Sequence, residues 1–165
     1  MASARGDLPE IFGSWACSQA SRSSNSGFDL FCLMATRGSG GWPRLGQGAF
    51  RVLVTDVYGR RCAVTQERTL PALEAAHIRP YGDGGAHEAR NGMLLRRDIH
   101  SLFDAGYVTV TPDLDFEVSR RIKEEFENGR HYYALHGNRI SAPEDASLRP
   151  DPDALTWHNE HCFRG

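Results

Sequence analysis

The sequence lacks the features of a membrane protein and of a disulfide-rich or zinc-ribbon protein. No apolar run approaches the roughly 20 residues that span a bilayer, and no basic region closely precedes the apolar run at residues 28–35, as a signal peptide would require. The four cysteines are widely spaced and form no C-x-x-C pair, which disfavours a zinc ribbon or a disulfide framework; they are Cys17, Cys32, Cys62 and Cys162. We therefore expect a cytoplasmic protein without a membrane partner.

Lysine is almost absent as well, since Lys123 stands alone beside 18 arginines. A GC-rich coding sequence explains this bias, but arginine forks also bind phosphates well, so both explanations stay open. The formal net charge of −2 argues against a strongly basic nucleic-acid-binding protein. Composition alone does not decide the substrate.

The chain divides into two parts of different composition. Residues 1–44 are rich in Ser, Gly and Ala, which predicts a flexible, low-complexity segment with one apolar island at residues 28–34. That island either docks on the rest of the chain or is the remnant of an upstream module. Residues 45–165 carry regular apolar patterns and are long enough to form one domain with its own core.

Within the second part, apolar spacings of three and four predict a helix over residues 50–58 that Gly59 ends. Short β-prone runs follow at residues 62–65, 71–78 and 93–95. Asp98 is a candidate N-cap for a helix that reaches Phe103 and ends before Gly106.

The remaining segment alternates short strands and helices. A hairpin is predicted from residues 107–110 and 115–118, and a short charged helix from residues 120–128. Residues 132–135 and 139–140 are expected to form another strand pair. A last helix over residues 154–163 has Asp153 as its candidate cap.

The stretch from Leu73 to Gly106 concentrates the residues suited to catalysis. His77 ends an apolar run, a glycine-rich loop leads to Asn91, and His100 follows a second apolar run. The spacings are 14 and then 9 positions. The loop lacks the Gly-Lys-Ser/Thr ending of a P-loop, so its glycines are expected to shape a turn.

Strand, loop, strand and helix with His, Asn and His at these points resemble the HNH endonuclease family. The surrounding motifs AAHIRPY, RNGMLLRRDIHSLFDAGYVTV and RPDPDALTWHNEHCF look similar to a bacterial subgroup of restriction and defence nucleases. The resemblance covers roughly Leu45 to Phe163. It implies an α+β fold, with a ββα-metal core elaborated by flanking helices and short β-hairpins.

The resemblance also implies roles for the three residues. His77 matches the general base, a role that suits a neutral imidazole near pH 7. Asn91 matches the residue that ties the loop to the hairpin, and His100 matches a metal ligand. Asp104 follows His100 by four positions on the same helical face, where colicin-type nucleases place a second ligand. An oxygen ligand favours Mg²⁺ or Mn²⁺ over Zn²⁺ or Ni²⁺.

This sequence departs from the family pattern at one position. Many members have an Asp or His ligand directly before the base, whereas this chain has Ala76. Glu74 and Asp98 are alternative ligands, ranked below Asp104. His87 is expected at the surface of the loop. Three arginines flank the site and either contact the DNA backbone or form a solvated face with salt bridges; they are Arg79, Arg96 and Arg97.

The expected function is metal-dependent hydrolysis of phosphodiester bonds in double-stranded DNA, of the restriction or defence type. One such site cuts one strand, so a double-strand break requires a homodimer or two successive nicks. A separate targeting subunit would fit the short N-terminal segment. The alternatives are an RNA-cleaving nuclease and an HNH-fold DNA-binding or partner-dependent module with impaired catalysis, which Ala76 favours.

Overall fold

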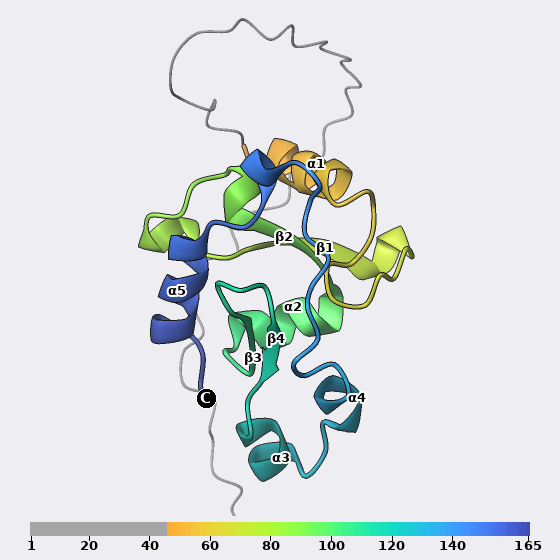
Figure 1. The fold of residues 1–165 in the computed structure, drawn as a ribbon, viewed down its shortest axis with the longest axis vertical. Coiled ribbons are helices and arrows are strands. Elements are labelled where there is room, and N and C mark those ends of the chain that lie inside the picture. Colours follow the sequence, from red (N-terminus) through yellow and green to blue (C-terminus); the bar gives the residue numbers. More distant parts are fainter. Residues whose placement is uncertain (1–45) are drawn as a thin grey trace, which may run out of the picture. The chain divides into compact units, whose positions relative to one another are not determined.

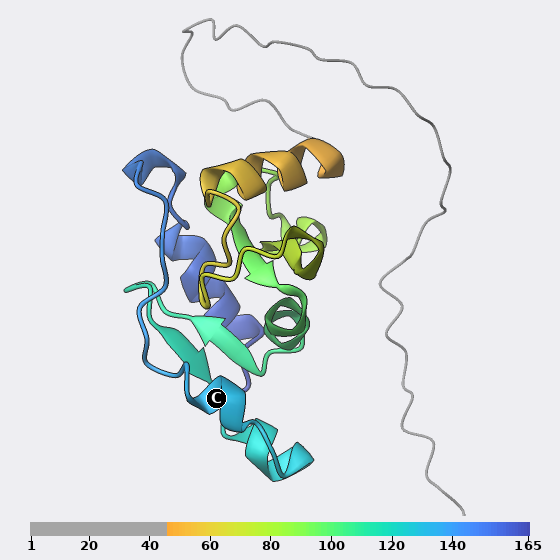
Figure 2. The same cartoon turned by 90° about the vertical axis from the view of Figure 1, so that its right-hand side faces the viewer.

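The computed structural model describes residues 46–165. They form an α+β domain in which two short antiparallel hairpins lie among helices (Figure 1, Figure 2). The predicted low-complexity segment and its apolar island lie outside the described residues. No helix within residues 46–165 is long and apolar enough to cross a bilayer.

The first hairpin leads directly into a helix. Strand β1 (Leu73–His77) pairs antiparallel with β2 (Gly92–Arg96), and His77 lies opposite Gly92 at the loop end. Helix α2 (Arg97–Asp104) begins at the residue after β2. This is the strand, loop, strand and helix order that the sequence predicted for a ββα core.

Helix α1 (Gln47–Val57) packs on this hairpin. Phe50 and Val54, four residues apart, form its buried face, as expected for an amphipathic helix. Its predicted end is also confirmed, because Gly59 takes a left-handed φ of 57° directly after the cap residue Tyr58.

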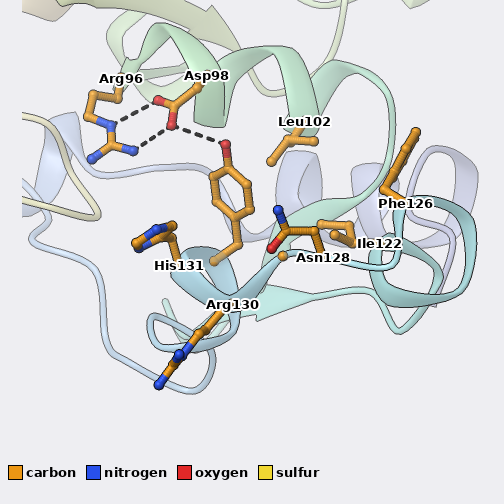
Figure 3. A pocket seen from close by; sticks show the side chains of 10 residues that line it. Arg96, Asp98, Leu102, Ile122, Phe126, Asn128, Arg130 and His131 are labelled. Atoms are coloured by element: carbon orange, nitrogen blue, oxygen red, sulfur yellow. Dashed lines mark hydrogen bonds and ion pairs between the residues drawn. The ribbon is translucent and has the colours of Figure 1, made fainter.

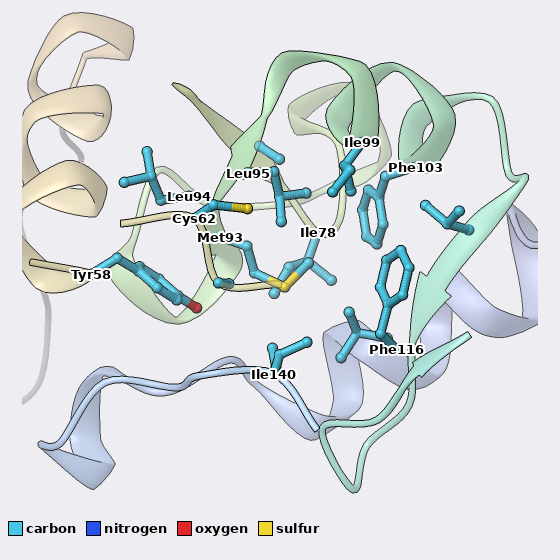
Figure 4. Packing of buried hydrophobic residues seen from close by; sticks show 14 of the residues in the cluster. Tyr58, Cys62, Ile78, Met93, Leu94, Leu95, Ile99, Phe103, Phe116 and Ile140 are labelled. Carbon is cyan, nitrogen blue, oxygen red and sulfur yellow. The ribbon is translucent and has the colours of Figure 1, made fainter. Parts of the chain in front are cut away.

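The core lies between the hairpin and α2. Four consecutive residues of β2 are buried, so this strand is covered on both faces and shows no apolar–polar alternation. In Figure 4, Leu95 of β2 lies nearest to Ile99 and Phe103 of α2, whereas Leu94 lies farther from them; Met93 belongs to the same buried cluster. A tightly packed strand of this kind gives the site at its end a rigid support.

The second hairpin matches its prediction. Strands β3 (Val108–Val110) and β4 (Phe116–Val118) pair antiparallel, and Leu114 in the turn has a φ of 69°. The C-terminal helices are α3 (Arg121–Phe126), α4 (Arg130–Tyr133) and α5 (Pro152–His161), with α5 against β3. Four single 3₁₀ turns complete the described chain: η1 (Leu70–Ala72), η2 (Tyr81–Asp83), η3 (Ala89–Asn91) and η4 (Ala146–Leu148).

Two predicted strands are wrong. Residues 132–135 fall in and after α4 instead of pairing with residues 139–140, because Gly129 at φ 107° starts a helical turn there. Arg139 bridges to Asp115. Residues 62–65 form turns, with Cys62 accepting a backbone hydrogen bond from Gln66.

Two predicted helix caps are also wrong. Asp98 lies in the first turn of α2, and the N-cap position belongs to Arg96, whose guanidinium binds the Asp98 carboxylate. Asp151, two residues before the predicted cap Asp153, caps α5 by accepting a hydrogen bond from the Asp153 amide. Both errors arose because an Asp in the first turn and an Asp at the cap produce nearly the same sequence pattern.

Candidate active site

His77, the predicted base, ends β1 with its ring stacked on Phe50. The ring centroids are 3.9 Å apart and the planes differ by 11°. The opposing Gly92 makes this possible, since a Cβ there would lie 2.9 Å from Cζ of Phe50 and 2.5 Å from Cγ2 of Val54. The missing side chain at Gly92 therefore lets α1 approach closely enough to orient the imidazole.

A second histidine contacts the ring edge of His77. Nε2 of His77 lies 2.9 Å from Nδ1 of His87, so the two nitrogens share one hydrogen bond. The His87 ring in turn stacks on Tyr81, with centroids 5.0 Å apart and planes 8° apart. Sequence reasoning placed His87 on the loop surface, whereas the structure places it half-buried against the predicted base.

Burial is the main influence on the protonation of His77. Burial and, to a smaller extent, electrostatic repulsion from the nearby His87 and His100 together lower the pKa of His77 to about 4. The His77 imidazole is therefore neutral at pH 7, with one ring nitrogen able to accept a proton.

Asn91 holds the loop between β1 and β2 through three hydrogen bonds. Its Oδ1 accepts from the amide of Arg79, and its Nδ2 donates to the carbonyls of Arg79 and Ala86, each at 2.9 Å. The loop backbone at Gly85 passes close to the Asn91 side chain, since a Cβ on Gly85 would lie 2.7 Å from Asn91 Nδ2. These are side-chain to backbone bonds of the kind that the family resemblance implies for Asn91.

His100 on α2 lies between two carboxylates. Its Nδ1 is 3.1 Å from Oε2 of Glu74, and its Nε2 is 3.3 Å from Oδ2 of Asp104. Burial on its own would raise the pKa of Glu74, but hydrogen bonds from His100 and Arg97 outweigh it and leave that pKa below its usual value. An ionised Glu74 therefore supports one ring nitrogen of His100 while the other faces Asp104.

This arrangement fits a divalent cation bound by few protein ligands. His100 offers nitrogen and Asp104 offers oxygen on one helical face, and the Asp104 side chain is 62% exposed. Among residues 46–165, no three His, Cys, Asp or Glu side chains converge tightly enough to form a complete cage. Mg²⁺ commonly binds through one or two carboxylates while keeping several waters, so an open pair suits it.

The three predicted phosphate-binding arginines already have partners within the protein. Arg79 donates from Nε to the Asp83 carbonyl at 2.6 Å, and its guanidinium lies over the Trp157 ring. Arg97 donates from Nε to Glu74 at 2.8 Å, with 65% of its side chain exposed. Arg97 has the most freedom to reach a phosphate.

Arg96 faces a separate hollow of about 500 Å³ between α2, α3 and α4 (Figure 3). Its Nε lies 2.8 Å from Asp98, and Tyr132 donates to the same carboxylate. This network raises the pKa of Arg96 and lowers that of Asp98, chiefly through their shared hydrogen bonds. The hydrogen bond from Tyr132 joins α4 to α2, and the two partners together engage Asp98 away from His100.

Comparison with known proteins agrees with this geometry. The profile of the HNH endonuclease family matches residues 62–111, which include β1, β2 and α2. Residues 62–111 are therefore similar to an HNH endonuclease domain. No curated protein matches the sequence.

A solved structure is similar to the HNH domain and its surroundings. It is entitled "Modification dependent TagI restriction endonuclease", with a TM-score of 0.53 and 22% identity. The match covers 71% of this chain and 38% of that one, so this chain corresponds to well under half of that protein. At this identity the likeness supports the fold alone, and it agrees with the α+β architecture.

Three residues of the HNH domain site escaped sequence reasoning or were ranked low. Phe50 was predicted only as a helix residue, and His87 only as part of the loop. Glu74 was ranked below Asp104 as a ligand, yet it contacts the opposite nitrogen of the same imidazole. The one available signal for Glu74 was the alternation of β1, which directs Glu74 and Ala76 to the same side of the strand.

Proposed function

We propose that this chain is a divalent-metal-dependent endonuclease that hydrolyses phosphodiester bonds of double-stranded DNA. One feature supports the proposal: the ββα unit carries both a neutral His77, at the end of β1, and an open pair of metal-type ligands on α2, His100 and Asp104. β1 pairs with β2, and α2 follows β2 directly and contacts β1, so the elements that carry these residues are neighbours.

In the proposed reaction His77 accepts a proton from the attacking water. Its low pKa keeps a lone pair available across the neutral range, and stacking on Phe50 fixes the plane of the ring. A bound Mg²⁺ or Mn²⁺ would stabilise charge on the phosphate and on the leaving 3′ oxygen. His100 and Asp104 would hold that ion, with Asn91 keeping the loop in place and Arg97 neutralising backbone phosphate.

We further propose a restriction or defence role, with DNA targeting by another part of the protein, a partner subunit or a second copy. Support comes from the similarity to a protein entitled a modification-dependent restriction endonuclease, of which this chain spans 38%. An HNH domain of this size has one site, so it cuts one strand at each encounter.

A second candidate is an HNH-fold DNA-binding module with impaired catalysis. The observation that favours it is Ala76, which is fully buried and provides no ligand where many HNH nucleases have one. Two protein ligands instead of three would weaken metal binding and make activity more dependent on metal concentration.

The experiment that separates these candidates uses supercoiled plasmid with EDTA, Mg²⁺, Mn²⁺ or Zn²⁺. We expect nicking with Mg²⁺ or Mn²⁺ and none in EDTA. DNA binding that persists in EDTA, with no cleavage at any metal concentration, would favour the impaired module. Faster cleavage of a matched RNA duplex than of DNA would contradict the proposed substrate.

A further inference from the structure

The contact between His77 and His87 determines which nitrogen of His77 can act as a base. Nε2 of His77 is occupied by Nδ1 of His87 at 2.9 Å, whereas Nδ1 of His77 has no hydrogen-bond partner among residues 46–165. No buried side-chain nitrogen or oxygen in this described part lacks a partner, so the His77 Nδ1 atom is accessible to water. A water molecule can therefore approach His77 through Nδ1.

Two neutral imidazoles that share one hydrogen bond have one proton between these nitrogens. If His77 carries it on Nε2, its Nδ1 keeps a lone pair and can accept a proton from water. If His87 carries the shared proton on its Nδ1, then the remaining proton of His77 is on His77 Nδ1. In that case His77 Nδ1 has no lone pair to accept a proton from water. The activity of His77 as a base thus depends on its tautomer.

The intrinsic tautomer preference of histidine favours the first arrangement. A free neutral histidine side chain favours the tautomer with its proton on Nε2. In that form His77 has a donor at Nε2, and His87 has an acceptor at Nδ1, which are the two atoms in contact. The opposite arrangement would require both residues to adopt the less favoured tautomer.

The surrounding contacts hold His87 in this position. Its ring stacks on Tyr81, and the residue before it, Ala86, accepts a hydrogen bond from Asn91 Nδ2 at 2.9 Å. Phe50 stacks on the face of His77 at 3.9 Å. The loop and α1 therefore fix the two imidazoles independently, so the contact is part of a built arrangement.

We propose that His87 is a positioning residue that holds His77 in the Nε2-protonated tautomer and leaves Nδ1 as its basic nitrogen. The catalytic consequence rests on the proposed nuclease function. The tautomer itself does not, because it is a property of the free protein without metal or DNA.

The direct test is ¹⁵N NMR of the imidazoles in the metal-free full chain near pH 7. We expect His77 to show a protonated Nε2 and an unprotonated Nδ1. The variant His87→Asn places its side-chain oxygen near the original Nδ1 and should keep this tautomer, whereas His87→Phe keeps the aromatic stack on Tyr81 and should give a mixture. A His77 protonated on Nδ1, or an unchanged spectrum in His87→Phe, would overturn the proposal.

Plasmid nicking provides the second readout. We expect kcat in His87→Phe to fall by only about twofold to tenfold with KM little changed, because the free imidazole already favours the active tautomer and the variant loses mainly the fixed orientation of the His77 ring, and we expect His87→Asn to recover much of the loss. An equal or higher rate in His87→Phe would mean that His87 blocks or merely adjoins the base. If the wild type nicks no DNA, the proposed function fails, while the NMR result still decides the tautomer.

Discussion

At the scale of single residues, the site depends on imidazoles that are held in place by their neighbours. His77 contacts His87, and His100 contacts Glu74 and Asp104. The residue types and spacing predicted His77, Asn91 and His100 as the site. They could not predict His87 or Phe50, because those contacts depend on how the loop folds back and how closely α1 approaches.

Glu74 is expected to support metal binding through His100. A carboxylate on Nδ1 orients the ring and raises the basicity of Nε2, so Glu74→Gln should weaken Mn²⁺ binding by about 10- to 100-fold in titration calorimetry. The matched control is Arg97→Gln, which removes the other partner of the same carboxylate. Equal weakening in both variants would assign the effect to the ion pair instead of His100.

His158 on α5 should make the fold sensitive to acid. Its ring is 2% exposed and lies between Thr109 and the Phe103 carbonyl, and burial lowers its pKa to about 4. Because the unfolded chain takes up this proton near pH 6.5 and the native state only near pH 4, stability is retained above pH 6.5 and falls between these values. Between pH 6.5 and pH 4 the free energy of unfolding falls by about 3 kcal/mol because of this group.

The measurement is chemical denaturation of wild type and His158→Gln at pH 7 and pH 4.5. Other groups, including His77, also destabilise the wild type in acid, so the quantity of interest is the difference in pH dependence. His158→Gln should lose less stability on acidification than the wild type. The exposed His161→Gln variant is the control, and equal losses in all three proteins would contradict the assignment.

At the scale of elements, the sequence predicted α1, the first hairpin, α2 and β3–β4 because each has a distinctive apolar pattern. It failed for α4, where Tyr132 and Tyr133 were taken for strand residues. Their hydroxyl groups donate hydrogen bonds to different parts of the domain: Tyr132 donates to Asp98, and Tyr133 donates to the Ser119 carbonyl. Those tertiary contacts are invisible in the local sequence, and they override the β preference of tyrosine.

The approach of α1 to the hairpin gives an element-scale prediction. Gly92→Ala would place a methyl group against Phe50 and Val54, so it should lower the free energy of unfolding by about 1–3 kcal/mol and reduce nicking by displacing His77. Thermal unfolding and plasmid nicking measure the two effects. Gly82→Ala is the matched control, because its added Cβ meets nothing within 4 Å. Equal unfolding free energies and equal nicking rates in the two variants would contradict the close packing of α1 on Gly92.

At the scale of the whole molecule, the single candidate site within residues 46–165 predicts the order of products. We expect nicked circles to accumulate before linear DNA, and linear DNA to increase with protein concentration as a second copy acts. Time courses at several concentrations on agarose gels measure this order. Linear DNA as the first product at all concentrations would show paired cutting by a preformed assembly.

The family and the ββα core were predictable from the sequence because motif and spacing lie within one continuous stretch, Leu73 to Gly106. The segment after the second hairpin was less predictable, since α4 depends on contacts between residues far apart in the sequence. The role of residues 1–44 stays a prediction. The central claim is that His77 provides the base of a metal-dependent nuclease.

The most direct test is the initial rate of plasmid nicking by His77→Ala, compared with the wild type and with the exposed control His131→Ala, in saturating Mn²⁺. We expect His77→Ala to lose about 100- to 10,000-fold in rate with Mn²⁺ binding unchanged, and His131→Ala to match the wild type. Cleavage by His77→Ala at the wild-type rate would contradict the account.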